Sequence, residues 1–264
     1  MKLTSACVVP YYDASVTIAS CYKSLITQTH EFDQIILVND GCRKTDKSLL
    51  KYFEDEDWEK LVWVCLPRNK GASAARNFGL DLAETALITF CDSDESLDPR
   101  KNEWQVDMFS DRKIDLVCFR DITGDQPSLS GNVLDVPYLE TLSFRHFIFK
   151  NPVILSSVCM RSSLNARFDE TLICAEDLDL WLRLSLEQDV AISRCNLGSV
   201  HPILGRYHAK GLSSQTVVMF KSLVKIYSKL AISSDLELIT RILSVVGLIF
   251  VPVRVAVGRL KRLI

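Results

Sequence analysis

The sequence predicts an α/β fold with a mostly parallel sheet flanked by helices and a C-terminal helical extension. Short apolar runs alternate with helix-like segments through the first half of the chain. These runs are nearly continuous, which is typical of parallel strands that are buried on both faces. After about residue 215 the composition changes to long helical segments that carry lysine and arginine. We therefore expect residues 1–215 to form the main domain and residues 216–264 to form a basic amphipathic tail.

The expected elements follow one another in order along the chain. The expected strands are residues 5–10, 34–40, 61–66, 86–91 and 115–120, with 156–164 returning to the sheet. The expected helices are residues 15–28, 45–55 and 72–84, and one within 168–189 whose apolar face is Leu178, Leu180, Trp181, Leu184 and Leu186. Residues 101–150 are otherwise less regular, and residues 124–131 are predicted to form a loop.

The overall composition is that of a globular protein. The 264 residues are 24% charged and 48% hydrophobic, with a formal net charge of −2. Near-neutral charge argues against non-specific binding of nucleic acid, so we expect no nucleic-acid partner. The nine cysteines form no CxxC pair, and Cys7, Cys65, Cys91 and Cys118 lie in apolar runs, where a free thiol acts as a small hydrophobe. The N-terminus lacks the apolar core of a signal peptide, so a reducing cytoplasm is the expected location.

Polar residues follow several of the predicted strands. They are Asp13, Asp40, Arg68 with Asn69, and Asp92 with Asp94. Because ligands of parallel sheets bind beyond the carboxyl ends of the strands, these residues predict a binding site at one edge. Asp92 and Asp94 stand two apart, so their like charges would face the same side. A metal ion, a helix N-terminus or simple hydration could each offset that repulsion.

Two nucleotide-binding motifs are absent from the sequence, since no GxxxxGK[ST] occurs and no GxGxxG follows the first strand. Instead, residues 69–80 read NKGASAARNFGL, a glycine turn that leads into a helix of small residues able to pack close to a sheet. Arg76 in this helix could reach a phosphate or could be solvated at the helix start. Glu176 and Asp177 begin another helix, where the helix dipole favours carboxylates by ~0.3–1 kcal/mol each. Helix capping is therefore an alternative to a catalytic role for this pair.

Four separate segments together resemble the signature segments of family 2 glycosyltransferases. They are VVPYYD (8–13), QIILVNDGCRKTD (34–46), NKGASAARNFGL with ITFCDSDE (69–95), and AEDLDLWLRLS (175–185). The segment GRYHAKGLSS (205–214) also resembles the one that closes over the donor in many members. The resemblance covers roughly residues 3–215, and it implies the GT-A, Rossmann-like fold.

The resemblance implies an enzyme that moves a sugar from a UDP-sugar donor to a hydroxyl group of the acceptor, with inversion and with Mn²⁺ or Mg²⁺. Asp94 would bind the metal ion as part of a DxD motif, and Asp92 would lie near the ribose or the metal. Arg206 and His208 would touch the metal or the diphosphate, although His208 could equally be a surface residue. The implied donor-binding residues are Pro10, Tyr12, Asp13, Asp40, Arg76, Asp92, Ser93 and Arg206. Among these, Pro10 and Tyr12 would frame the base and Asp40 would accept a hydrogen bond from uracil.

The same resemblance makes Asp177 the general base that deprotonates the acceptor, with Glu176 orienting the acceptor or the base. Three positions depart from the common pattern: Asn39 precedes Asp40, Cys42 replaces a serine, and Glu95 follows the DxD. One alternative is a catalytically silent module that binds a nucleotide sugar, in which Asp177 is only a helix cap. A sugar-1-phosphate nucleotidyltransferase is a further alternative, which the lack of a glycine- and lysine-rich loop after the first strand disfavours.

The tail is predicted to be helical and basic. Lys221, Lys225 and Lys229 stand at every fourth position and form one stripe. The apolar run 242–253 is shorter than the ~20 residues of a membrane span, and Pro252 would kink it. We therefore expect an amphipathic segment at the inner face of the cytoplasmic membrane, with packing on the main domain or a homodimer contact as the alternatives. By resemblance, the acceptor would be a glycan or a lipid-linked sugar of cell-surface polysaccharide or lipopolysaccharide synthesis.

Overall fold

The computed structural model describes residues 3–42, 59–111, 114–119, 139–188, 190–193, 200–202 and 216–260. The expected helix 45–55 and the expected loop 124–131 lie outside these ranges, as do Arg206 and His208.

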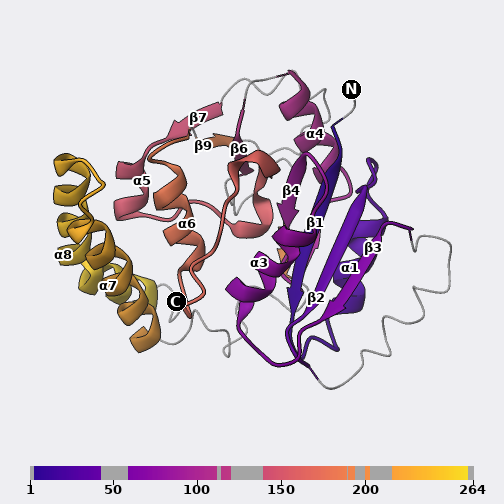
Figure 1. Cartoon of the computed structure of the whole chain (residues 1–264), viewed down its shortest axis with the longest axis horizontal. Helices are drawn as coiled ribbons and strands as arrows, with labels where there is room; N and C mark the ends of the chain where they lie inside the picture. Colours follow the sequence, from indigo (N-terminus) through magenta and orange to yellow (C-terminus); the bar gives the residue numbers. More distant parts are fainter. Residues whose placement is uncertain are drawn as a thin grey trace.

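An eight-stranded sheet with the order β3-β2-β1-β4-β8-β6-β9-β7 forms the centre of the molecule (Figure 1). Its first half is parallel and consists of β1 (Ser5–Tyr11), β2 (Gln34–Asn39), β3 (Leu61–Cys65) and β4 (Leu87–Phe90). Its second half is mixed and consists of β8 (Cys159–Arg161), β6 (Leu116–Phe119), β9 (Val190–Ser193) and β7 (Leu139–Leu142). In this half β8 and β7 run antiparallel to their neighbours, while β6 and β9 are parallel. The predicted α/β class and the predicted return of 156–164 to the sheet are both confirmed.

Helices cover both faces of the sheet. Along β1, Ala6 and Val8 face a core cluster that includes α3 (Ala72–Leu82), α5 (Phe144–Phe149) and α6 (Glu176–Leu184). The alternate residues of β1 face the opposite side, where they meet α1 (Ile18–Ile26). The helix α4 (Lys101–Asp111) packs on that side against β4 and β6. Two 3₁₀ turns, Leu155–Ser157 and Ser162–Leu164, flank β8, and a small second sheet pairs β5 (Glu95–Leu97) with β10 (Val200–Pro202).

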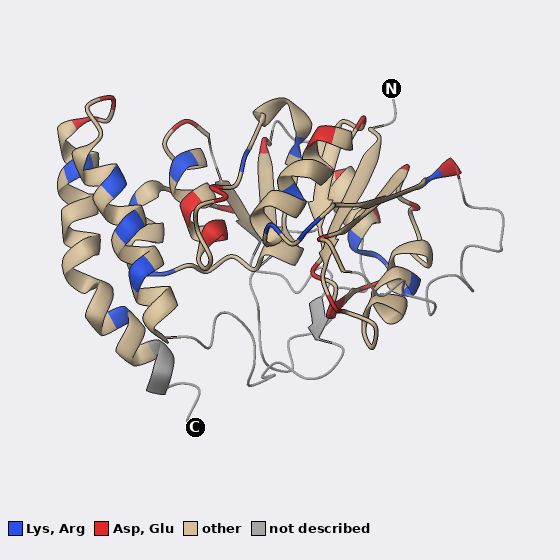
Figure 2. Cartoon of the chain, turned by 60° about the horizontal axis from the view of Figure 1, so that its bottom comes forward, with Lys and Arg blue, Asp and Glu red and all other residues tan. Residues whose placement is uncertain are grey.

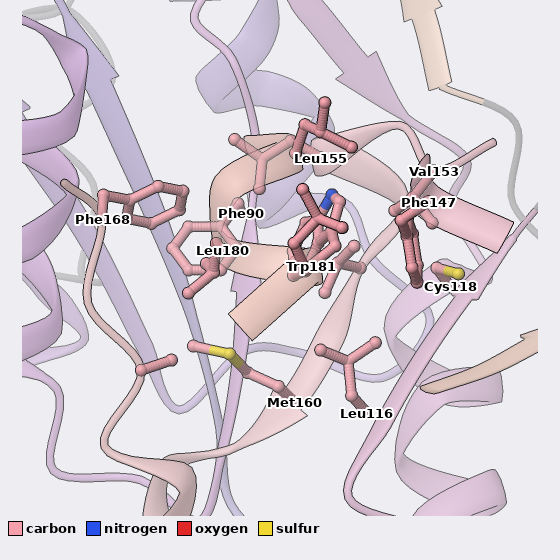
Figure 3. Close-up of a cluster of buried hydrophobic side chains, with 14 of the residues drawn as sticks. Phe90, Leu116, Cys118, Phe147, Val153, Leu155, Met160, Phe168, Leu180 and Trp181 are labelled. Carbon is pink, nitrogen blue, oxygen red and sulfur yellow. The ribbon is translucent and has the colours of Figure 1, made fainter. Parts of the chain in front are cut away.

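The start of α6 is fixed by the largest of these cores (Figure 3). Trp181 and Leu180 are fully buried against Phe90 and Met160, which come from β4 and β8. Phe168 meets Phe90 edge to face, with 5.5 Å between the ring centroids. This packing holds the first turn of α6 next to the end of β4.

The small residues of α3 allow a close approach to the sheet, as predicted. A Cβ atom at Gly79 would lie 2.4 Å from Cγ1 of Val8 in β1. The cysteine prediction is confirmed for Cys7, Cys91 and Cys118, which are buried. It is wrong for Cys65, which is exposed because it ends β3 at the edge of the sheet. All of the described cysteines are free thiols.

The C-terminal region is a pair of helices, α7 (Thr216–Ile232) and α8 (Leu238–Leu260), that pack on each other and lie beside α5 (Figure 1). Tyr227 of α7 donates a hydrogen bond to the carbonyl of Ile148 (2.9 Å) and accepts one from Arg254 of α8 (2.7 Å). A Cβ atom at Gly247 would lie 2.8 Å from the Tyr227 ring, so the two helices are in close contact.

The structure supports the alternative that the tail packs on the main domain, and it corrects one expectation about the length of the apolar segment. Lys225 donates to Thr171 and Lys229 pairs with Asp169 at 3.1 Å, so two lysines of the predicted stripe contact the main domain. The helix α8 continues through Pro252, and Leu238–Val257 forms 20 residues with a mean hydropathy of 2.0. This segment is long and apolar enough to cross a membrane, because helical length depends on all of its residues and not only on the uninterrupted apolar run. The division of the chain at residue 215 stays a prediction.

Candidate active site

The polar residues that follow the parallel strands meet at one edge of the sheet, as predicted. Tyr11 pairs with Asn39 across β1 and β2, and Val8 pairs with Phe90 across β1 and β4. The segments that leave these three strands carry Tyr12 with Asp13, Asp40, and Asp92 with Asp94. Several candidate residues therefore lie together at the carboxyl edge of β1, β2 and β4.

Backbone amide groups hold Asp40 in place. The side chain is buried, and its two oxygens accept hydrogen bonds from the amides of Lys70 (2.7 Å) and Gly71 (2.8 Å). Gly41 has φ +76°, and a Cβ atom there would lie 2.3 Å from the carbonyl carbon of Arg68. The turn after β2 therefore requires glycine and brings the loop before α3 against Asp40. The role of Asp40 toward uracil stays a prediction.

Asn39, which stands where the common family pattern has an acidic residue, has a structural role in the same turn. Its Oδ1 accepts the amide of Cys42 at 2.7 Å and closes the same turn. Asparagine and cysteine at these positions therefore keep the loop geometry.

The other predicted donor-binding residues lie around this edge in different environments. Pro10 is buried within β1, whereas Tyr12 is 54% exposed. Asp13 is exposed and takes a left-handed backbone conformation, with φ 50°. Ser93 is half-buried beside Asp92. An exposed ring at Tyr12 leaves a face on which a base can stack.

Arg76 joins two motifs that lie far apart in the sequence. Its Nη2 donates to Oδ1 of Asp92 at 2.7 Å, and its Nη1 donates to Oε1 of Glu176 at 2.8 Å. Its side chain is 5% exposed, and its guanidinium lies 5.4 Å from the centroid of the Phe168 ring. The alternative of a solvated arginine at the helix start is therefore wrong. Because one buried cation pairs with both carboxylates, the DSD segment and the start of α6 form one cluster.

Asp177 lies beside this cluster with a perturbed pKa. Burial, together with the adjacent charge of Glu176, raises the pKa of Asp177 to about 6, although Asn151 donates a hydrogen bond to its Oδ2 at 2.7 Å. The residue that precedes α6, Ala175, has a left-handed backbone conformation with φ 59° and no side chain able to cap the helix. The two acids of the first turn of α6 thus have specific partners, Arg76 and Asn151, in addition to the helix dipole.

Three carboxylates crowd the end of β4. Burial, followed by the charge of Asp92 and with a smaller contribution from Asp94, raises the pKa of Glu95 to about 8. One carboxylate oxygen of Glu95, Oε2, is buried without a hydrogen-bond partner among the described residues. Such crowding is relieved when a cation binds between the carboxylates.

The donor chemistry of these residues fits a hard divalent cation. Within the described ranges, no group of three or more His, Cys, Asp or Glu side chains is arranged to hold a metal ion by itself. Mg²⁺ is commonly held by one or two carboxylates together with substrate phosphates, so a preformed protein cage is not required. Asp92 and Asp94 could supply the protein ligands in that case.

A cavity of about 850 Å³ opens beside the cluster. Arg76, Asp92, Glu176 and Asp177 contribute to its lining, together with residues of α5, α7 and α8. The candidate base Asp177 therefore faces a space that can hold a substrate of moderate size.

Two residues of this site, Asn151 and Ser156, could not be recognised from the sequence. Asn151 follows α5 in the stretch KNPV, which carries no recognisable motif. Ser156, whose Oγ accepts the amide of Asp92 at 3.0 Å, comes from a 3₁₀ turn that periodicity does not reveal. Only the fold brings these two polar groups to the acidic cluster.

Comparisons with known proteins agree with this arrangement. The model of the family described as glycosyl transferase family 2 matches residues 6–166, more than half of the chain. An uncharacterized glycosyltransferase, YibD, of Escherichia coli is 32% identical over 124 residues, which are 45% of this chain and 35% of that protein. An uncharacterized glycosyltransferase of Haemophilus influenzae is 30% identical over 146 residues, covering 53% of this chain and 57% of that protein. The minor teichoic acid biosynthesis protein GgaB of Bacillus subtilis is 28% identical over 182 residues, which are 66% of this chain and 20% of that protein. The chain therefore matches only part of the length of these relatives.

Solved structures share the fold. Residues 1–349 of Staphylococcus aureus TarS superpose with a TM-score of 0.68 at 16% identity, covering 94% of this chain and 71% of that one. The same protein in complex with UDP-GlcNAc gives a TM-score of 0.64 at 16% identity, with coverages of 94% and 72%. The mannosyltransferase PcManGT of Pyrobaculum calidifontis, in complex with GDP-Man and Mn²⁺, superposes with a TM-score of 0.64 at 13% identity. The match covers 98% of this chain and 75% of that one. At these identities the likeness concerns the fold, which is GT-A.

Proposed function

This chain belongs to glycosyl transferase family 2, and on that premise we propose that it transfers a sugar from a UDP-sugar to a hydroxyl group of a glycan acceptor. The transfer inverts the anomeric carbon and uses Mn²⁺ or Mg²⁺, in the assembly of a cell-surface polysaccharide. The name of GgaB, a teichoic acid biosynthesis protein, supports the polysaccharide class. The complex of TarS with UDP-GlcNAc supports a uridine donor, while the GDP-Man complex of PcManGT makes a guanosine donor the alternative to be tested.

The observation that carries this proposal is the double contact of Arg76. Its hydrogen bonds to Asp92 (2.7 Å) and Glu176 (2.8 Å) join the DSD segment to the first turn of α6, and Asp92 and Asp177 both line one cavity, which supports the proposal. A transfer reaction needs both groups of residues at once, because the leaving diphosphate and the incoming hydroxyl are on opposite sides of the same carbon atom.

In the proposed reaction Asp177 accepts the proton of the acceptor hydroxyl. The oxygen then forms a bond to the anomeric carbon while the bond to the diphosphate oxygen breaks, and the diphosphate leaves with the electron pair. A base with a pKa of about 6 is mostly ionised at neutral pH and still close enough to the working pH to take a proton. Asn151 holds the Asp177 carboxylate in place, and Glu176 helps to orient it through the contact with Arg76.

The donor is placed by the parallel half of the sheet. Tyr12 stacks on the base, Pro10 frames it, and Asp40 receives a hydrogen bond from it, while Asp13 and Ser93 line the ribose and diphosphate. Asp92 and Asp94 are the residues that would hold the metal ion, which neutralises charge on the leaving diphosphate when bound. Arg206 and His208 complete the proposed set toward the diphosphate or metal.

Two substitutions test the proposal and its main alternative. We expect Asp177→Asn to reduce transfer by ~10²–10⁴-fold, because a positioned base typically contributes that factor, while UDP still binds in the presence of Mn²⁺. We expect Asp94→Asn to abolish transfer and also to remove the Mn²⁺-dependent part of UDP binding, measured by thermal shift. Asp81→Asn is the control, because among the described residues Asp81 forms an exposed ion pair with Arg167 and lies outside the cavity lining.

The outcomes separate the hypotheses. Wild-type turnover by Asp177→Asn refutes its role as the base. UDP binding without turnover by the wild type, over a broad panel of acceptors, favours the silent binding module. Stabilisation by GDP-sugars but not by UDP-sugars refutes the uridine donor and leaves the transferase class intact.

We also propose that the helical pair associates with the inner face of the cytoplasmic membrane. Only 17% of the segment Leu238–Val257 is buried in the protein, which leaves large apolar side chains such as Ile239 and Ile242 exposed. Figure 2 shows basic positions spaced along the two helices, with uncharged ribbon between them. Co-sedimentation with vesicles that contain anionic lipid tests this, and a protein that stays in the supernatant contradicts it.

A further inference from the structure

We propose that the helical pair α7 and α8 positions the proposed base, because Tyr227 and Arg254 brace the end of α5, from which Asn151 holds the Asp177 carboxylate. Tyr227 and Arg254 are therefore positioning residues that act through Asn151. The inference rests on the proposed function for the role of Asp177 in the reaction, whereas the bracing of Asn151 is a separate property of the fold.

The end of α5 depends on side chains from other helices. The last four carbonyl groups of a helix have no hydrogen-bond partner within that helix. In α5 the carbonyls of Phe147 and Ile148 accept hydrogen bonds from Nη1 of Arg254 at 3.4 Å and 3.3 Å. The Tyr227 hydroxyl donates to the Ile148 carbonyl at 2.9 Å and accepts a hydrogen bond from Arg254 at 2.7 Å. One residue of α7 and one of α8 thus complete the last turn of α5.

This network lies in the core of the protein. Tyr227 is 0% exposed and Ile148 is 1% exposed. Both belong to the core cluster that contains Leu178 of α6 (Figure 1 shows α5 and α6 next to the helical pair). A buried carbonyl that loses its partner is penalised by more than the net value of a typical hydrogen bond. The contacts of Tyr227 and Arg254 therefore fix the position of the α5 end.

A short segment joins the end of α5 to the proposed base. Asn151 comes three residues after Ile148, which is at most ~10 Å along an extended chain. Its Nδ2 donates to Oδ2 of Asp177 at 2.7 Å, and its Oδ1 accepts the amide of Val153 at 3.3 Å. A displacement of the α5 end therefore displaces the amide group that orients the Asp177 carboxylate.

The helical pair also contacts the loop that leads into α6. Lys225 donates to the carbonyl of Thr171 at 3.1 Å, and Lys229 pairs with Asp169 at 3.1 Å. Exposed ion pairs contribute little, and the Lys229 side chain is 59% exposed. We therefore expect these lysine contacts to have a smaller effect on the base than the buried network at the end of α5.

Several charged groups surround Asp177, and the choice of variant has to keep them in place. They are Glu176 of the same helix, Arg76 of α3, and the cavity-lining Asp92, Lys150 and Arg254. Replacing Arg254 removes a cation as well as the brace, whereas Tyr227→Phe removes a hydroxyl group and no charge. Tyr227→Phe therefore separates positioning from electrostatics, and it keeps the buried ring that the core requires.

The first test compares Tyr227→Phe with Tyr22→Phe, since each variant removes the hydroxyl group of a buried ring. Tyr22 lies in α1, in the core on the opposite face of the sheet. We expect Tyr227→Phe to lower kcat by about 5- to 10²-fold, because a misplacement of ~1 Å can cost ~10²-fold, and to leave the dissociation constant of UDP unchanged. We expect Tyr22→Phe to leave both quantities unchanged.

A second comparison uses two arginines of α8. Arg241 donates to the carbonyl of Ala231 in α7 at 3.1 Å and so joins the two helices to each other. We expect Arg254→Met to lower kcat at least as much as Tyr227→Phe, and Arg241→Met to leave it unchanged. In the Asn151→Ala background Tyr227→Phe should lower kcat no further, because residues that act through one contact are not additive. A purely structural effect of Tyr227 would instead add to that of Asn151→Ala.

An NMR titration of the Asp177 carboxyl carbon in the full chain needs neither donor nor turnover. The Asn151 hydrogen bond favours the ionised carboxylate, so loosening it in Tyr227→Phe should raise the pKa of Asp177 above the wild-type value, as in Asn151→Ala. A pKa that rises in Asn151→Ala but not in Tyr227→Phe overturns the inference, whether or not the wild type transfers a sugar.

The kinetic outcomes are equally decisive. Wild-type kcat in Tyr227→Phe, equal losses in Arg254→Met and Arg241→Met, or additive losses with Asn151→Ala each overturn the inference while the proposed function stands. If the wild type transfers no sugar but the pKa of Asp177 rises in Tyr227→Phe, the bracing of Asn151 stands and only the proposed function fails.

Discussion

Two sides of the molecule, the carboxyl edge of the parallel strands and the helical pair α7 and α8, are built by different means. At the edge of the strands, main-chain geometry fixes the polar groups: Asp40 accepts two backbone amides, and Gly41 permits the turn that brings those amides near. At the helical pair, apolar packing dominates, and the polar contacts to the main domain come from a few side chains such as Tyr227, Arg254 and Lys229. The positions of polar groups are thus set by the backbone at the edge of the strands and by side chains at the helical pair.

The largest expected effect is on Arg76, the residue that joins the DSD segment to the start of α6. Arg76→Met leaves Asp92 and Glu176 without their shared cation, and breaking a buried pair costs about 3–5 kcal/mol of the free energy of unfolding. Arg167→Met removes an exposed pair with Asp81 and a hydrogen bond to the adjacent carbonyl of Ala166, and the loss of the exposed pair should cost about 0–1 kcal/mol. Urea denaturation of both variants measures the difference. Equal losses would mean that Arg76 does not hold the cluster together.

A pair of glycine variants distinguishes the two sides directly. Gly79→Ala pushes α3 away from Val8 in β1, and Gly247→Ala pushes α8 away from the Tyr227 ring. Overpacking typically costs about 1–3 kcal/mol in each case. We expect only Gly79→Ala to weaken UDP binding, because α3 carries Arg76 and begins at the loop that holds Asp40. An equal loss of UDP affinity in Gly247→Ala would show that the two sides are not independent.

The smallest expected effect is a shift of pH dependence. Asn151 donates to the ionised form of Asp177, so Asn151→Ala should raise the pKa of that carboxylate further above its ordinary value. Since the base must be ionised to act, transfer by the wild type should fall as the pH drops through about 6, and the fall in Asn151→Ala should begin at a higher pH. Profiles of kcat/KM against pH measure this shift. If the fall of kcat/KM at low pH is the same in Asn151→Ala and in the wild type, Asn151 does not help to position the base.

Much of the parallel half could be predicted from the sequence. Its strands are continuous apolar runs, and the polar residues that follow them mark the edge where ligands bind. The helix α4 was missed for a physical reason: its buried face includes Lys101, Asn102 and Gln105, which break the apolar pattern. These side chains are tolerated inside because they are hydrogen-bonded: Asn102 donates to Ser5 and Gln105 donates to the carbonyl of Ser157, both from distant segments, while Lys101 donates to Gln105 of the same helix.

The remainder of the candidate site depends on packing that no local pattern reports. The sequence predicted that Glu176 and Asp177 begin a helix, and α6 does begin there. The pairing of Arg76 with both motifs could not be predicted, because nothing in residues 69–80 indicates which way a buried guanidinium points. The length of α8 was underestimated because charged and proline residues interrupt its apolar run without interrupting the helix.

The most direct test of the proposed function is a crystal structure with UDP and Mn²⁺ bound. We expect the uracil to lie by Tyr12 and Asp40, the diphosphate to lie by Asp92 and Asp94, and the carboxylate of Asp177 to face the diphosphate across the cavity. A nucleotide bound away from the carboxyl edge of β1, β2 and β4, or an Asp177 carboxylate turned away from it, would refute the proposed arrangement.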